Sequence, residues 1–137
     1  MSRFRFRGKD VNSGEWVYGH LNLRYKASFI GDEDAYYING REVDPNTIGQ
    51  YVGLKDKNGQ LIFEGDLLYI DEEMPCVLAK WSYSDHGFAL FWHGDDIYDV
   101  RSEPLYCFDR WPMQVIGNIH DKDIQEKIQN VKIWNEK

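Results

Sequence analysis

The chain has 137 residues, 42% of them hydrophobic and 28% charged, which is typical of one globular domain, alone or with a small appendage. Its net charge is −7, and because proteins that bind nucleic-acid backbones normally carry a basic face, this charge disfavours nucleic acid as a partner. The longest apolar run, residues 88–92, is too short to cross a bilayer, and the first residues lack the apolar segment of a signal peptide. We therefore expect a cytoplasmic protein without a membrane partner.

Aromatic residues make up 15% of the chain, and 12 glycines are scattered at turn-like positions. Strands are enriched in aromatic residues and bounded by turn residues, so we predict a mainly β fold. The two cysteines, Cys76 and Cys107, are too few for a disulfide framework. We interpret them as reduced, partly buried thiols.

The first predicted element is a hairpin near the N-terminus. Residues 3–7 alternate arginine and phenylalanine, so a strand here carries the two phenylalanines on one face. The other face carries three arginines, Arg3, Arg5 and Arg7. Residues 12–14 predict a turn and residues 15–21 the second strand. The arginine face has two open interpretations, a solvated strand face or a stripe that binds anions.

Residues 24–46 carry a weak alternating signal. Within them, residues 36–38 predict a short strand, and the pair Asn39–Gly40 predicts a tight turn. Residues 44–46 form a further break that contains a proline. We assign residues 1–46 to a small N-terminal β part that leads into the main body.

Residues 47–120 predict the main body, since short apolar runs alternate there with turn residues, as in small barrels and sandwiches. The runs are residues 50–54, 61–63, 67–70, 76–83, 88–92, 97–100 and 114–119. Residues 121–137 predict a short C-terminal helix. Ile124, Ile128 and Val131 recur there at i, i+4 and i+7 and form one apolar stripe.

The loop of residues 56–59 reads Asp-Lys-Asn-Gly and has the acids and amides of a cation-binding loop. An EF-hand loop places its glycine two residues later, and Lys57 would put a positive charge beside the ion. Asn-Gly is instead a strong hairpin signal, because both central positions of a type I′ turn need positive φ. We predict a hairpin turn in which the Asp56 carboxylate accepts backbone N–H groups.

The chain lacks the local signatures of catalysis. It has no P-loop, no H-E-x-x-H and no G-x-S-x-G, and the adjacent pair Asp95–Asp96 would face opposite ways on a strand. His86 and His93 bracket one predicted strand, so they lie roughly 20 Å apart and do not share a metal. We predict that the protein is not an enzyme and binds no metal or cofactor.

Aromatic residues crowd the second half of the chain. Stacking platforms for single-stranded nucleic acid place such rings beside basic residues, whereas here the neighbours are acidic. We interpret most of the rings as core and a few as an exposed surface for protein–protein contact. Trp92 and Tyr98 are the candidates for that surface.

Four segments carry a resemblance to a known family. They read FRGKD, GEWVYGHL, QYVGLKDKNGQLIFEGDLL and QVIGNIHD, and together they resemble the YopX family of phage and prophage proteins. The likeness runs from Arg5 to about Asp121. It implies a mainly β protein with an SH3-like β-barrel in its second half, a bacterial cytoplasmic setting and a gene carried on a mobile element. It implies no reaction, because the family has no established activity.

The leading hypothesis is a non-enzymatic binding module, a phage-encoded accessory protein that contacts a protein partner or itself. The alternative is nucleic-acid binding through Arg3, Arg5 and Arg7. A metal-dependent hydrolase is the least favoured hypothesis, since no metal-ligand spacing supports it.

Overall fold

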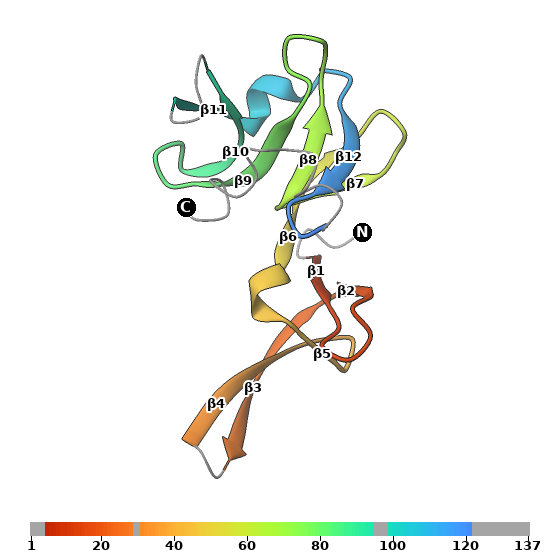
Figure 1. Cartoon of the computed structure of the whole chain (residues 1–137), viewed down its shortest axis with the longest axis vertical. Coiled ribbons are helices and arrows are strands. Elements are labelled where there is room, and N and C mark those ends of the chain that lie inside the picture. The colour runs from red at the N-terminus through yellow and green to blue at the C-terminus, as the bar shows by residue number, and fades with distance from the viewer. Residues whose placement is uncertain (1–4, 29–30, 95–98, 122–137) are drawn as a thin grey trace. The chain divides into compact units, whose positions relative to one another are not determined.

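A computed structural model of the chain describes residues 5–28, 31–94 and 99–121, and only the backbone of residues 25–28 and 31–33. The chain divides into two compact units, residues 1–51 and 52–137 (Figure 1). The predicted mainly β fold is confirmed, and the helical elements of the described residues are two short 3-10 helices, η1 (Pro45–Thr47) and η2 (Leu105–Phe108). The C-terminal helix predicted for residues 121–137 lies, from residue 122 on, outside the described residues.

The first unit is built from short antiparallel strands. They are β1 (Phe6–Lys9), β2 (Trp16–Gly19), β3 (Leu21–Ser28), β4 (Gly31–Ile38), β5 (Arg41–Val43) and the start of β6 (Gly49–Lys55). The predicted N-terminal hairpin is β1 with β2, whose register pairs Phe6 with Gly19 and Lys9 with Trp16. The start of β6 also pairs with β1, and Tyr51 donates its backbone N–H to the Arg5 carbonyl. This pairing extends the first unit past residue 46 to residue 51.

Strands β3 and β4 form a long hairpin. The sequence pattern predicts only the end of it where Leu21 pairs with Ile38. Their register runs from Leu21 opposite Ile38 to Ser28 opposite Gly31, and β5 covers only the last three residues of β4. Ile38 is fully buried, but Leu23 on the partner strand is 58% exposed. An exposed leucine of this kind weakens the alternating apolar pattern that marks a strand with one buried face.

The two Asn-Gly pairs form different turns. Asn39 and Gly40 both have positive φ, as a type I′ hairpin turn requires. The type I′ turn predicted at Asn58–Gly59 is wrong, because only Gly59 has positive φ there. The central residues of that turn are Lys57 and Asn58, and the Gly59 N–H donates to the Asp56 carbonyl at 3.0 Å. The Asp56 carboxylate fixes this geometry, as predicted, by accepting the N–H groups of Asn58 and Gln60.

The second unit begins with the remainder of β6, which pairs with β7 (Leu61–Phe63). Its main sheet curls into half a barrel with the strand order β11-β10-β9-β8-β12, all neighbours antiparallel. The strands are β8 (Asp66–Tyr69), β9 (Val77–Ser82), β10 (Gly87–His93), β11 (Val100–Pro104) and β12 (Gln114–Asn118). The predicted runs match these strands except at β11, which follows the undescribed residues 95–98 and continues to Pro104 instead of ending at residue 100.

Each unit has its own apolar core. In the first unit, Val17, Ile38 and Val43 are at most 5% exposed and pack together. The second unit has a larger cluster, in which Leu68, Val77 and Leu90 are fully buried. Among the described residues, no helix has the length and hydropathy needed to cross a membrane.

Candidate functional site

The arginine face predicted on the first strand is not an open stripe. Arg3 lies outside the described residues, and Arg5 is half-buried. Arg7 is only 4% exposed, and its guanidinium carbon lies 4.4 Å from the centroid of the Trp16 ring. Because Lys9 is directly opposite Trp16, Arg7 lies diagonally across from the same indole. Arg7 therefore contributes to packing within the first unit.

Neither of the two aromatic residues predicted for a binding surface is found exposed in the described part of the chain. Trp92 is half-buried and packs against the main core of the second unit. Tyr98 lies outside the described residues. Among the described residues, other rings are exposed, including Tyr83 and Tyr106, and the sequence pattern did not separate them from the core.

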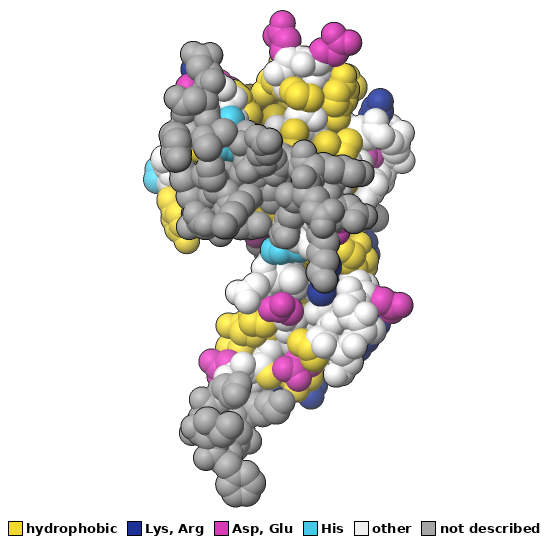
Figure 2. Space-filling model, in the orientation of Figure 1, with side chains coloured by type: hydrophobic (Ala, Val, Ile, Leu, Met, Phe, Trp, Pro, Cys, Tyr) yellow, Lys and Arg dark blue, Asp and Glu magenta, His cyan; other side chains and the backbone are white. Residues whose placement is uncertain are grey.

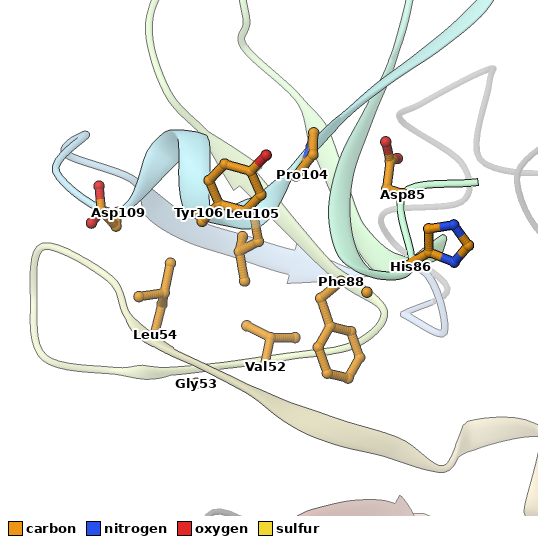
Figure 3. A pocket seen from close by; sticks show the side chains of 11 residues that line it. Val52, Gly53, Leu54, Asp85, His86, Phe88, Pro104, Leu105, Tyr106 and Asp109 are labelled. Atoms are coloured by element: carbon orange, nitrogen blue, oxygen red, sulfur yellow. The ribbon is translucent and has the colours of Figure 1, made fainter. Parts of the chain in front are cut away.

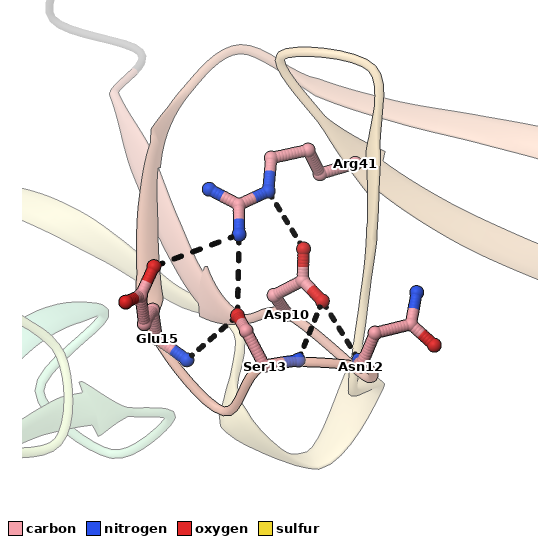
Figure 4. A network of polar contacts seen from close by, with 5 residues as sticks. All are labelled: Asp10, Asn12, Ser13, Glu15 and Arg41. Carbon is pink, nitrogen blue, oxygen red and sulfur yellow. Dashed lines mark hydrogen bonds and ion pairs between the residues drawn. The ribbon is translucent and has the colours of Figure 1, made fainter.

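A polar network closes the turn between β1 and β2 (Figure 4). One oxygen of the Asp10 carboxylate accepts the backbone N–H groups of Asn12 and Ser13, at 2.7 and 3.0 Å. Its other oxygen accepts the Arg41 Nε–H at 2.6 Å, and the same guanidinium reaches Ser13 Oγ at 3.2 Å and Glu15 at 3.8 Å. The network ties the β1–β2 turn to strand β5.

These hydrogen bonds define what Asp10 does chemically. The Asn12 and Ser13 N–H groups, followed by Arg41, hold the pKa of the Asp10 carboxyl below its usual value. A carboxylate held ionised in this way is a poor general acid. Its partners are two backbone N–H groups of the same turn and an arginine of β5, which fix the conformation of the turn. We therefore assign the network to the stability of the first unit and not to a reaction.

The second unit contains a pocket of about 360 Å³ (Figure 3). Its walls come from β6, the turn before β10, and the segment from the end of β11 through η2. The lining residues are Val52, Gly53, Leu54, Asp85, His86, Gly87, Phe88, Pro104, Leu105, Tyr106 and Asp109. In Figure 3, apolar side chains lie in the middle of the pocket, and polar groups stand at its two ends.

One end of the pocket carries Asp85 and His86, and the other carries Asp109 (Figure 3). The Asp85 carboxylate accepts the hydroxyl groups of Ser82 and Ser102 at 2.8 and 3.0 Å, which fixes the turn to the neighbouring strands. His86 has a positive φ of 56°, an uncommon conformation for a residue other than glycine. Asp109 follows η2 and is exposed.

Exposed aromatic side chains occur on the pocket and on the strands and turn that form it. Tyr106, which lines it, is 77% exposed, and Tyr83, at the start of the Asp85 turn, is 87% exposed. Trp81 is 41% exposed and stacks edge-to-face on the lining residue Phe88, with ring centroids 5.3 Å apart. Figure 2 shows one face of the molecule, on which hydrophobic side chains reach the surface of the second unit and acidic side chains stand at its upper end.

Neither cysteine of the chain has the lowered pKa of an activated thiol. Burial raises the pKa of the Cys76 thiol to about 11. Desolvation, and then the nearby carboxylates of Glu103, Asp85 and Asp109, raise the pKa of Cys107. A catalytic cysteine needs a lowered pKa, because the thiolate is the reactive form. The described residues also contain no group of three or more His, Cys, Asp or Glu side chains arranged to hold a metal ion.

The fold and this site define a small, two-unit β protein with an apolar pocket on its second unit. Comparison with protein families then identifies it: the chain belongs to the YopX family, whose model, described as YopX protein, matches residues 5–123. The search of curated proteins gives no match. Among solved structures, the crystal structure of protein EF1440 from Enterococcus faecalis is similar, at 24% identity and a TM-score of 0.45, and the match covers 88% of this chain and 95% of that one.

Proposed function

We propose that this chain is a non-enzymatic binding module whose second unit, an SH3-like β-barrel, engages a protein through the pocket beside Tyr106. The observation that carries the proposal is the exposed position of Tyr106 on an apolar pocket. Tyrosine and tryptophan are enriched at the centre of protein interfaces, where they supply a large rigid contact area. The curled antiparallel sheet of five short strands supports the barrel.

The same geometry argues against the competing functions. Arg7 is buried, so an arginine stripe for nucleic acid would consist of Arg3 and Arg5 alone. The raised pKa values of both thiols argue against cysteine catalysis. The phage or prophage origin, the accessory role and the bacterial cytoplasmic setting belong to the same proposal, and the family resemblance supports them.

A photo-cross-linking experiment tests the proposal. Tyr106 is replaced with p-benzoylphenylalanine, and the variant is irradiated in cells of the organism that carries the gene. We expect a covalent product with one protein, because Tyr106 is 77% exposed at the pocket rim. The matched control carries the same group at Tyr69, a surface tyrosine of β8 that does not line the pocket. It is expected to give no such product.

The captured protein is then purified and titrated against the chain by calorimetry. Tyr106→Ala should weaken its binding about tenfold or more, the loss expected for an aromatic residue at the centre of an interface. Cross-linking to nucleic acid, equal products from both positions, or unchanged affinity of Tyr106→Ala would each contradict the proposal.

A further inference from the structure

The charge of the protein is divided unequally between its two units. Residues 1–51 contain seven basic and seven acidic residues, whereas residues 52–137 contain nine basic and sixteen acidic residues. The net charge of −7 therefore belongs to the unit that contains the pocket. An acidic surface raises the local concentration of cationic partners and repels anionic ones.

The acidic charge reaches the pocket itself. Asp85 and Asp109 line opposite ends of it. Glu103, which precedes the lining residue Pro104 in the chain, is close enough to Cys107 to help raise the pKa of that thiol. Asp109 is exposed at the pocket rim, where its carboxylate can meet a group of a partner. Asp85, in contrast, is already held by two serine hydroxyls.

The middle of the pocket has the opposite character. Val52, Leu54 and Phe88 form one wall, and Leu105 faces them from η2 (Figure 3). The volume of about 360 Å³ is near the lower end of the range for small-ligand pockets, about 300–1,000 Å³. That space suits one or two side chains of a peptide segment, with room for a neighbouring side chain to reach the rim.

We propose that the pocket takes a segment of a basic partner protein, in which an apolar side chain enters between Val52, Leu54 and Leu105 and an adjacent arginine or lysine meets Asp109. The inference rests on the proposed function and names the partner's chemistry. A second copy of the chain fits less well, because its pocket-bearing unit has the same negative net charge and the net charge of its first unit is zero. Nucleic acid is repelled for the same reason.

The test uses the purified full chain and a displayed library of random octapeptides. The selected pool is expected to be enriched in arginine or lysine beside a large apolar residue, relative to the unselected library. The consensus peptide is then synthesised with a fluorophore, and its affinity is measured by anisotropy. Raising the salt concentration should weaken binding, since rim charges act through screened electrostatics.

Two charge reversals of the same size locate the contact. Asp109→Lys removes an attraction at the pocket rim and adds a repulsion, so it should weaken the consensus peptide about tenfold. Asp34→Lys makes the same change in net charge on exposed Asp34 of β4 in the first unit, and it should change the affinity by less than about twofold. Thermal unfolding of both variants confirms that they are folded.

Each outcome decides the inference. A selected pool without excess basic residues, an absence of selected binders, or equal effects of the two reversals would overturn it. If the Tyr106 cross-link still identifies a protein partner in any of those cases, the proposed function stands and only the partner's chemistry is wrong. A cross-link between two copies of the chain would likewise overturn the basic partner while keeping protein binding.

Discussion

Asp56→Ala is expected to lower the free energy of unfolding of the second unit by about 3 kcal/mol, the sum of several lost hydrogen bonds to a charged group. The side chain is 6% exposed. One carboxylate oxygen accepts the N–H groups of Asn58 and Gln60, both at 2.9 Å, and the other accepts the Val115 N–H at 3.1 Å. Alanine removes the acceptor of three N–H groups and the side-chain link between the β6–β7 turn and β12.

Amide hydrogen exchange of β8, β9 and β10 measures this loss in the second unit alone. Asp56→Asn keeps one carbonyl oxygen for the turn but presents an amide to one of the donors, so a smaller loss of about 1 kcal/mol is expected. Asn58→Ala changes an exposed side chain of the same turn and should stay within about 0.5 kcal/mol of the natural protein. An Asp56→Ala variant as stable as Asn58→Ala would show that the carboxylate does not hold the turn.

Leu90→Ala is expected to cost about 3 kcal/mol, within the range of roughly 2–5 kcal/mol for truncating a buried leucine. Leu90 is fully buried on β10, which pairs on both sides, with β9 and with β11. It belongs to the core cluster with Leu68 and Val77. Strands paired on both sides relax little, so most of the cavity left by the missing methyl groups should persist.

Chemical denaturation followed by tryptophan fluorescence measures the effect of Leu90→Ala. Ile116→Ala is the control, because Ile116 is 41% exposed on β12 and its truncation should cost about 0.5 kcal/mol or less. Equal losses for the two variants would mean that the cluster around Leu90 is not the centre of the core.

Much of the strand framework could be predicted from the sequence, because short apolar runs and turn residues encode it locally. The hairpin of β1 and β2, strand β7 and the turn at Asn39–Gly40 all follow from residues next to one another in the chain. The sequence pattern predicts only the part of the β3–β4 hairpin near residues 36–38, where β5 pairs with β4 and Ile38 is buried in the core.

Other errors arose where a side chain's environment comes from a distant segment. Alternation placed Arg7 on a polar face, but Trp16 of the partner strand covers that face. The Asp56 carboxylate also accepts the N–H of Val115 of β12, a contact between residues 59 apart in the chain. Neither the Arg7–Trp16 contact nor the Asp56–Val115 contact has a local sequence pattern.

The pocket could not be predicted for the same reason. Its residues come from three separate parts of the chain, residues 52–54, 85–88 and 104–109, and they meet only when the sheet curls. The available clue was composition: aromatic residues among acidic ones in the second half suggested a protein-binding surface. It did not indicate that Tyr106 would be exposed while Trp92 would pack against the core.

The most direct test of the central claim, that the pocket of the second unit is the protein-binding site, is a map of the contact on the chain. The chain labelled with nitrogen-15 is titrated with the consensus peptide from the library selection, and amide chemical shifts are followed by NMR. The pocket predicts that the largest changes fall on residues 52–54, 85–88 and 104–109. Changes centred on β1 and β2 of the first unit, with the pocket residues unaffected, would contradict it.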